Sequence, residues 1–354
     1  MVIIMFIFHT LTHQLNRLYL NLLNIKILKF AIDKISQKLK LLLIKYAINF
    51  YYYFYKNIYY EIDYGTFIHL KNISDYIKNK NINIRTFSNG FDIESKRIIE
   101  DFVKKACYIS NHRILQKKMV FSLESVKKRI KVYNEIKLMK KKLKLPIDKF
   151  YPSVFYNLCG LYSLPKDILS YLNGRDFIDG GAYVGDSSLV FEKFFSPRHV
   201  YAFEPDIANY RLMLRTIKYN KLEKIIPINK ALDKKCTVLK MQFSGSTSRV
   251  SKEGPKDILT ESVDDLVSKE SLNVGLIKLD VEGHAKKVIE GSRKTIIRQK
   301  PILTIDIYHN GEEFFEIVEY LKNLSSNYEY IIRRFDPLDP LHEITLIAIP
   351  SLKN

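Results

Sequence analysis

From residue 174 onward, short strand-like runs alternate with helical patterns, and this alternation restricts the fold more than any other feature. The strand-like runs cover residues 176–179, 199–203, 225–231, 274–279, 302–307 and 344–349, and the helical patterns cover residues 184–195, 207–219, 285–298 and 312–324. Strands that alternate with helices form right-handed crossovers and a mostly parallel sheet. We therefore predict an α/β domain whose ligands bind in the loops that follow the strands.

The first part of the chain differs from this pattern and predicts a separate region. Residues 1–150 are mainly helical by their periodicity, contain few Gly or Pro, and have no role that the sequence reveals, whereas residues 151–354 contain the α/β domain. Ser122 or Glu124 could open a helix that runs to about Leu145. Its expected apolar face consists of Val126, Ile130, Tyr133, Ile136 and Met139.

The positive charge of the chain is concentrated in this region. Residues 1–150 hold 29 Lys and Arg against 11 Asp and Glu, which gives +18 of the total +19. A solvated basic helix explains such a charge run, and so does a surface that contacts an anionic membrane or a phosphorylated substrate. Codon bias toward Lys could contribute as well. We expect peripheral contact with an anionic membrane as one role of this region.

Nothing in the sequence predicts secretion or a membrane-spanning helix. The apolar start at residues 1–8 lacks a basic segment before it and a cleavage site after it. Leu39–Tyr55 is the most apolar stretch, but lysines interrupt it and it falls short of the roughly 20 residues that span a bilayer. The three cysteines lie far apart, which favours a reducing compartment. We expect a cytoplasmic protein, with attachment at the inner membrane face as an open alternative.

A glycine loop follows the first strand of the α/β domain. Asp179, Gly181 and Gly185 form a D-x-G-x-x-x-G pattern before a helix, where the backbone can approach a ligand closely. The second strand ends at Glu204, which is placed to accept hydrogen bonds from ribose hydroxyls. Together, the two elements predict a cofactor that contains a nucleoside.

The glycine pattern also distinguishes between cofactors. Ala182 stands where a dinucleotide fingerprint needs its middle glycine, and this argues against an NAD-dependent oxidoreductase. The acidic Asp179 suits a cofactor with a cationic end. S-adenosyl-L-methionine has an ammonium group and a sulfonium and has no pyrophosphate. The residues therefore favour a methyltransferase.

Six stretches of the chain carry a resemblance to a known family. They are FIDGGAYVGDSS (177–188), AFEPDIANYRLM (202–213), ESVDDL (261–266), LIKLDVEGHAKKVIEGS (276–292), PILTIDIYHNGEEFFEIVEYL (301–321) and HEITLIAIP (342–350). In these stretches, over about residues 174–350, the chain resembles the FkbM family of S-adenosylmethionine-dependent methyltransferases. The resemblance implies a Rossmann-like class I methyltransferase sheet. It also implies O-methylation of a small molecule or glycan, and the YH-containing block is most similar to members from bacterial polysaccharide clusters.

The resemblance also implies roles for individual residues. Asp179, Gly181 and Gly185 would hold the methionine end of the cofactor, Glu204 the ribose, and Ala231 would lie near the adenine. The loop Asp280-Val281-Glu282-Gly283 would face the transferring methyl group. The family usually continues with Ala-Glu, but this chain has His284 and Ala285, so a carboxylate is lost and an imidazole appears beside it.

Methyl transfer to a hydroxyl gains from a general base whose pKa lies near the working pH. The candidates are Asp280, Glu282, His284, Asp306 and His309. His284 stands out because imidazole titrates near neutrality. Carboxylates such as Asp280 and Glu282, with a histidine, could also hold a hard cation, but no spacing demands it and we predict no metal site.

Several alternatives remain open at this level. A nucleic-acid methyltransferase is disfavoured because the catalytic half is nearly neutral and lacks an NPPY or DPPY loop. The acceptor could instead be another small molecule, such as a polyketide. The chain could also be a non-catalytic, membrane-associated module. The sequence predicts no oligomeric state.

Overall fold

The computed structural model describes residues 59–62, 64–112, 114–116, 123–242, 249–250, 256–325, 327–336 and 341–351. The chain divides into two units, Met1–Tyr55 and Lys56–Asn354. The prediction for Leu39–Tyr55 and the helical prediction for residues 1–58 therefore lie outside the described residues. All that follows concerns the second unit.

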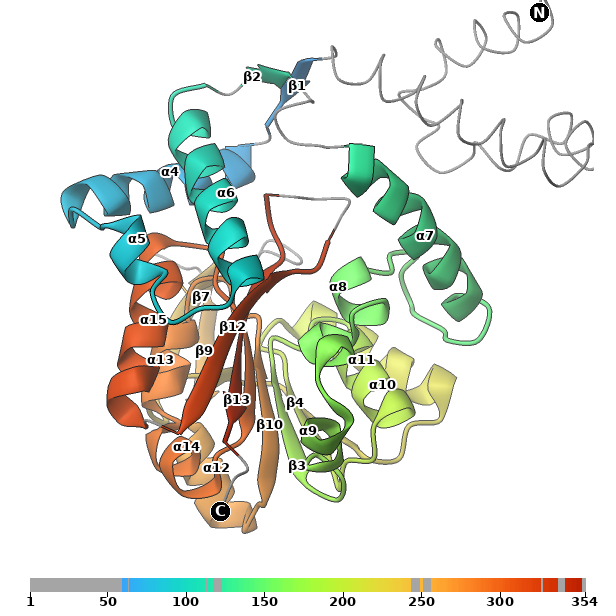
Figure 1. The fold of residues 1–354 in the computed structure, drawn as a ribbon. Coiled ribbons are helices and arrows are strands. Elements are labelled where there is room, and N and C mark those ends of the chain that lie inside the picture. Colours follow the sequence, from blue (N-terminus) through green and yellow to red (C-terminus); the bar gives the residue numbers. More distant parts are fainter. Residues whose placement is uncertain are drawn as a thin grey trace, which may run out of the picture. The chain divides into compact units, whose positions relative to one another are not determined.

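A seven-stranded sheet forms the centre of this unit, in the order β12-β13-β11-β10-β3-β4-β5 (Figure 1). All neighbouring strands are parallel except β13, which is antiparallel to both β11 and β12. The strands are β3 (Asp176–Gly180), β4 (Val200–Phe203), β5 (Ile225–Ile228), β10 (Val274–Leu279), β11 (Ile302–Asp306), β12 (Tyr328–Arg334) and β13 (Ile344–Pro350). The mostly parallel sheet that the alternation predicts is thus present.

Helices cover both faces of the sheet, as a parallel sheet of apolar strands requires (Figure 1). One face carries α10 (Asp186–Phe194) and α11 (Ile207–Asn220), and the other carries α12 (Val263–Glu270), α13 (Ala285–Glu290), α14 (Arg293–Gln299) and α15 (Gly311–Leu324). Every residue of β3, β4 and β10 is buried in consequence. The loops after these strands therefore start from a rigid framework.

Some predicted elements differ in their extent. The helical pattern over residues 285–298 is two helices, because the chain turns at Gly291 and Ser292 between α13 and α14. The strand predicted over residues 225–231 is split into β5 and the separate β6 (Ala231–Leu232). Strand β12 was not predicted, although it lies at the edge of the main sheet.

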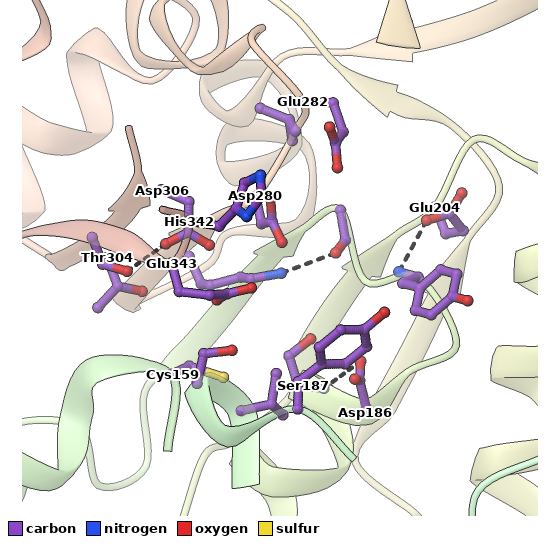
Figure 2. Close-up of a pocket in the computed structure, with 18 of the residues that line it drawn as sticks. Cys159, Asp186, Ser187, Glu204, Asp280, Glu282, Thr304, Asp306, His342 and Glu343 are labelled. Carbon is purple, nitrogen blue, oxygen red and sulfur yellow. Dashed lines mark hydrogen bonds between the residues drawn. The ribbon is translucent and has the colours of Figure 1, made fainter. Parts of the chain in front are cut away.

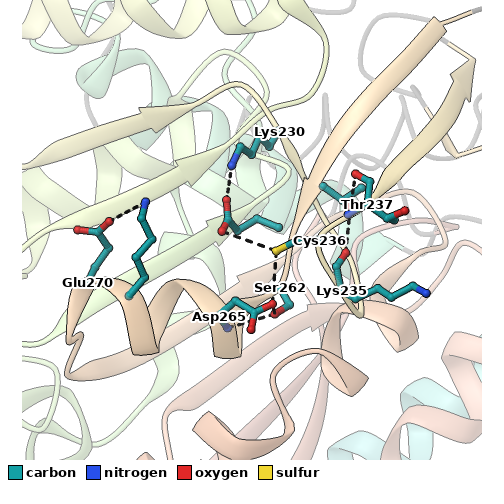
Figure 3. Close-up of polar contacts among 10 residues, drawn as sticks. Lys230, Lys235, Cys236, Thr237, Ser262, Asp265 and Glu270 are labelled. Atoms are coloured by element: carbon teal, nitrogen blue, oxygen red, sulfur yellow. Dashed lines mark hydrogen bonds and ion pairs between the residues drawn. The ribbon is translucent and has the colours of Figure 1, made fainter.

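A smaller sheet lies beside the main one, with the order β6-β9-β7-β8. Its other strands are β7 (Val238–Gln242), β8 (Arg249–Val250) and β9 (Lys256–Glu261). Figure 3 shows the polar contacts at its base, where the Sγ of Cys236 is 3.3 Å from Oδ2 of Asp265. Ser262 caps α12 by accepting from the amide of Asp265 at 3.1 Å, and Asp264 accepts from the amide of Thr295 at the start of α14 at 2.8 Å. The ESVDDL stretch therefore has a structural role here.

The helices that precede residue 150 pack on the same unit. They are α4 (Tyr64–Asn79), α5 (Ile84–Phe87), α6 (Ile93–Ile109) and α7 (Leu123–Met139), and a short hairpin joins β1 (Tyr59–Glu61) to β2 (Ile114–Gln116). Ser95 of α6 donates from Oγ to the carbonyl of Ile332 and accepts from the amide of Ile332, at 3.2 and 2.8 Å. These bonds satisfy the backbone N–H and C=O of Ile332 in edge strand β12, which would otherwise be unpaired. The division at residue 150 as a domain boundary stays a prediction.

The basic helix begins where the sequence predicts but ends earlier. Helix α7 stops at Met139 rather than near Leu145, because a turn follows over residues 140–142. Of its predicted apolar face, Ile136 is buried in the core together with Val132. Short helices α8 (Pro152–Phe155), η2 (Leu158–Ser163) and α9 (Lys166–Ser170) then lead into β3.

Candidate active site

A cavity of about 490 Å³ opens at the carboxyl ends of the central strands. This is where ligands bind in sheets of this topology, and the size is within the range of small-molecule sites. Six of the residues singled out by sequence line it: Gly181, Glu204, Ala231, Asp280, Glu282 and His284. Asp306, a further candidate, lines it as well (Figure 2). Residues that sequence reasoning did not single out complete the wall, including Lys278, Asp186, Tyr183, His342 and Glu343.

The glycine loop turns sharply at Gly181, where φ is +75°. A Cβ atom at this position would lie 1.8 Å from the carbonyl oxygen of Asp280, so only glycine fits between the two loops. Gly185 also has a positive φ of +80° and precedes α10, but it does not line the cavity. The two glycines thus shape the loop, and Gly181 alone meets the cavity.

Glu204 is buried at the end of β4, and both of its carboxylate oxygens are bonded to backbone amides. Oε2 accepts from the amide of Tyr183 at 2.9 Å (Figure 2). Oε1 accepts from the amide of Asp206 at 2.8 Å. Burial raises the pKa of Glu204 to about 8, although these amides favour the charged form. The carboxylate therefore ties the glycine loop to the second strand while it faces the cavity.

Asp179 has a different place from the one that sequence motifs suggest. It is fully buried and does not line the cavity. Its Oδ2 accepts from the hydroxyls of Ser187 and Ser188, both at 2.6 Å, and its Oδ1 lies 3.2 Å from Nζ of Lys278. Asp179 thus positions the start of α10 and a buried lysine, and its direct contact with the cofactor stays a prediction.

Lys278 is the main residue that sequence reasoning missed. Its Nζ donates to the carbonyl of Gly181 at 2.9 Å, which fixes the glycine loop from the neighbouring strand. Burial lowers the pKa of Lys278, but the carboxylates of Asp179 and Asp280 outweigh burial and raise it. A lysine near the carboxyl end of an otherwise apolar, fully buried strand was the signal that could have revealed it.

The loop after β10 brings an imidazole to the cavity beside its carboxylates. His284 precedes α13, and its Nε2 lies 2.8 Å from Oδ1 of Asp233, which follows β6. Asp280 and Glu282 of the same loop line the cavity. A histidine held by a carboxylate is the usual arrangement of a general base.

His309 lies directly behind these two carboxylates rather than on the cavity wall. Its Nδ1 is 3.2 Å from Oε2 of Glu313, and its Nε2 is 3.5 Å from Oδ1 of Asp280 and 3.7 Å from Oε2 of Glu282. Burial lowers the pKa of His309, but the hydrogen bond to Glu313 and the nearby carboxylates raise it to about 10. His309 is therefore placed to hold Asp280 and Glu282 together.

Negative charge accumulates at this end of the cavity. Burial, followed by the neighbouring Asp280, raises the pKa of Asp306 to about 7. Burial likewise raises the pKa of Glu282 to about 7, and it raises the pKa of Glu343 well above its usual range. Several carboxyl groups with raised pKa values in one cleft are typical of a functional site.

The backbone around the cavity also departs from ordinary geometry. Four residues other than glycine that line it have positive φ values: Tyr183 (48°), Glu282 (51°), Cys159 (55°) and Glu343 (56°). Such conformations cost of order 1–3 kcal/mol each and concentrate at ligand-binding sites. This observation supports the cavity as the functional centre independently of its charges.

The sheet order, the antiparallel β13 and the cavity at the carboxyl ends define a Rossmann-like class I methyltransferase fold. Residues 179–331 match the family model of the methyltransferase FkbM domain, in agreement with the resemblance that the motifs carry. No curated protein matches the chain significantly.

A solved structure of the same domain type agrees with this fold. The structure of methyltransferase FkbM from Methylobacillus flagellatus KT has a TM-score of 0.53 and 15% sequence identity, over 78% of this chain and 60% of that one. The present chain thus matches less than two thirds of that protein. The M. jannaschii tRNA m1G37 methyltransferase has a TM-score of 0.35 and 16% identity, over 60% of this chain and 55% of that one. M. jannaschii TYW2 in complex with AdoMet has a TM-score of 0.30 and 15% identity, over 58% of this chain and 77% of that one.

Proposed function

We propose that the protein is an S-adenosyl-L-methionine-dependent O-methyltransferase. Its acceptor in this proposal is a hydroxyl of a sugar or glycan precursor in bacterial polysaccharide biosynthesis. The observation that carries the proposal is the pairing of two features in one cavity, within a methyltransferase domain of the FkbM type. One is a nucleoside-binding corner around Glu204, and the other is an acceptor end with a histidine–aspartate pair.

The cofactor fits the residues that are present at the first corner. Glu204 presents a carboxylate for ribose hydroxyls, and charge-assisted hydrogen bonds of this kind are among the strong ones. Apolar side chains of Leu232 and Met241 line the cavity beside Ala231, which suits a flat base. The buried carboxyl of Asp186 also lines the wall and suits the ammonium group of the methionine end. S-adenosyl-L-methionine supplies an electrophilic methyl group on a sulfonium.

The acceptor end has groups that can take a proton from a hydroxyl. His284 is the favoured base, because Asp233 holds one of its ring nitrogens. Asp280, Glu282 and Asp306 line the same end and can orient further hydroxyls. A polyhydroxylated acceptor such as a sugar matches this dense set of hydrogen-bond acceptors better than an apolar one.

Transfer of a labelled methyl group tests the proposal. The purified full-length protein should transfer label from S-adenosyl-L-methionine to sugar or glycan acceptors, and nuclear magnetic resonance of the product should show a new O-methyl signal. Label on a polyketide hydroxyl alone would redirect the substrate class. Absence of cofactor binding by calorimetry would instead favour a non-catalytic module.

The location of the enzyme is part of the proposal. None of the described helices is both long and apolar enough to span the bilayer. The exposed lysines of the 1–150 region supply positive charge for an anionic inner membrane face, where lipid-linked sugar acceptors would lie. We infer a cytoplasmic enzyme that can attach peripherally to that surface.

A further inference from the structure

Three side chains that could each donate one ligand atom meet at the acceptor end of the cavity. They are Asp280 and Glu282 in the loop after β10, and His309 in the loop after β11. One ligand atom from each lies within 4.8 Å of the other two. The two loops are neighbours because β10 and β11 are adjacent parallel strands. The sheet topology itself therefore assembles the cluster.

Two of these ligand atoms are buried without a hydrogen-bond partner. Nε2 of His309 and Oδ1 of Asp280 face each other at 3.5 Å, beyond an ordinary hydrogen bond. The His309 side chain is only 3% exposed, so water does not satisfy its nitrogen. A buried polar atom without a partner lowers the stability of the folded state unless a bound ligand interacts with it.

The opposite side of the His309 ring is already held in place. Its Nδ1 lies 3.2 Å from Oε2 of Glu313, and Oε1 of Glu313 accepts from the amide of Ala285 at 2.7 Å. When Nδ1 donates to this carboxylate, Nε2 faces Asp280 and Glu282 and offers a lone pair to a metal ion that displaces its proton. A carboxylate behind a histidine is the arrangement that metal-binding histidines have.

Other aromatic rings pack around His309, and the two carboxylates lie on the side that remains for a cation. The centroids of the Tyr308 and His309 rings are 4.2 Å apart, and the ring of His69 from α4 meets the His309 ring edge-on with centroids 5.9 Å apart. Asp306 and Glu343 line the same cavity. A bound cation would offset the repulsion between the carboxylates of Asp280 and Glu282.

The spacing of the cluster suits a divalent ion. Two atoms that each lie about 2.1 Å from one ion are roughly 3.0–3.5 Å apart in octahedral or tetrahedral geometry. The separations from Nε2 to the two carboxylates, 3.5 and 3.7 Å, are close to this range. One imidazole with two carboxylates suits Mn²⁺ or Zn²⁺ better than Ca²⁺, which prefers oxygen ligands alone.

We propose that Asp280, Glu282 and His309 bind a divalent transition-metal ion, and that Glu313 positions His309 for this role. Because Asp280 and Glu282 line the cavity, the open coordination positions of the ion face the acceptor. The ion would bind two neighbouring hydroxyls and lower the pKa of the one that is methylated. This role in catalysis rests on the proposed methyltransferase function, but the metal site itself does not.

The test uses full-length protein freed of metal by a chelator, without cofactor or acceptor. Calorimetry with Mn²⁺, Zn²⁺, Mg²⁺ and Ca²⁺ should show one site that prefers Mn²⁺ or Zn²⁺. His309→Asn and Asp280→Asn should remove this site, and Glu313→Gln should weaken it about 10–100-fold. Glu312→Gln changes an exposed carboxylate one residue away, which pairs with Lys286, and it should bind as the wild-type protein does.

A spectroscopic readout separates a ligand from a structural residue. Bound Mn²⁺ should show coupling to an imidazole nitrogen by pulsed electron paramagnetic resonance, and this coupling should be absent in His309→Asn. Circular dichroism establishes which variants fold, and the wild-type titration decides the matter if none of them does. No binding of any of the four ions, or binding that survives both His309→Asn and Asp280→Asn, would overturn the proposal. Cofactor binding without metal binding would defeat this inference alone, and metal binding without cofactor binding would defeat the proposed function alone.

Discussion

His284 and Asp233 are 51 residues apart in the sequence, yet Nε2 of His284 lies 2.8 Å from Oδ1 of Asp233. The pair connects the loop after β10 to the turn that follows β6. A carboxylate that holds one ring nitrogen fixes the orientation of the imidazole. This relationship gives His284 the second partner that a general base needs, and motif reasoning could not supply it.

Replacing His284 tests this role most directly. His284→Ala should lower turnover by roughly 10²–10⁴ while cofactor affinity changes little, because the base acts on the acceptor. Asp233→Asn should lower turnover less, since the imidazole stays but loses the carboxylate that orients it. Steady-state kinetics and calorimetry give the two readouts. His112→Ala, at an exposed histidine that bonds only locally to Tyr108, is the matched control. Full turnover in His284→Ala would show that His284 is not the general base, and Asp280, Glu282 and His309 would be tested next.

Glu204 should contribute directly to cofactor affinity. Loss of its carboxylate should weaken S-adenosyl-L-methionine binding by about 1.5–3 kcal/mol, the range for hydrogen bonds to charged groups. Glu204→Gln is the better variant than Glu204→Ala, because the single oxygen of glutamine still accepts from one of the amides of Tyr183 and Asp206, whereas alanine would leave both unsatisfied. Calorimetry measures the affinity, and unchanged binding in a folded variant would remove Glu204 from the cofactor site.

The raised pKa of Glu204 predicts a pH dependence of stability. Burial raises this pKa from 4.5 to about 8, so the folded state holds more protons than the unfolded state between these values. The contribution of Glu204 to the free energy of unfolding is therefore fully present below about pH 4.5. It is lost as the pH rises toward 8, by up to about 1 kcal/mol per pH unit. Urea unfolding of wild-type and Glu204→Gln proteins from pH 5 to 9 measures the effect. The free energy of unfolding of the variant should depend less on pH than that of the wild-type protein. An identical pH dependence would contradict a raised pKa of Glu204.

The sequence predicts much of the sheet because apolar strands and amphipathic helices leave periodic signals. It predicts less of the site, for reasons that particular residues illustrate. Asp179 and Glu204 both end strands, but only tertiary packing places one behind Lys278 and the other against the cavity. The pair His309–Glu313 lies within one helical turn, yet its meaning depends on Asp280 in another loop.

Gly181 offers a test of how closely two loops of the site approach each other. A Cβ atom at this position would lie 1.8 Å from the carbonyl oxygen of Asp280. Gly181→Ala should therefore cost about 3 kcal/mol or more in stability and abolish cofactor binding, since the loops after β3 and β10 must separate.

Gly174 provides the matched control for this variant. Its φ of +69° is similar to that of Gly181, but nothing lies within 4 Å of the position that a Cβ atom would take there. Gly174→Ala should cost only about 1 kcal/mol, the strain of the left-handed conformation alone. Thermal unfolding compares the two free energies. Equal losses would show that conformation, and not the contact with Asp280, decides the need for glycine.

The basic region before residue 150 leads to a prediction about membranes. Lys131, Lys137, Lys141 and Lys142 are exposed on or just after α7. Each well-placed lysine contributes about 1 kcal/mol of attraction to an anionic surface. The full-length protein should therefore sediment with vesicles that contain anionic lipid at low salt. Salt should release it, because the Debye length falls to about 3 Å at 1 M.

Charge reversal separates this attraction from a mere excess of lysine in the chain. Replacing Lys131, Lys137, Lys141 and Lys142 by Glu should abolish sedimentation at low salt while methyl transfer to a soluble acceptor persists, because none of the four lines the cavity. The control reverses four exposed lysines elsewhere, namely Lys193, Lys218, Lys221 and Lys235, which changes the net charge equally. If both variants lose binding alike, total charge and not the α7 surface drives attachment. Retention of the wild-type protein on neutral vesicles without release by salt would instead indicate apolar insertion, for which Leu39–Tyr55 is the segment to delete.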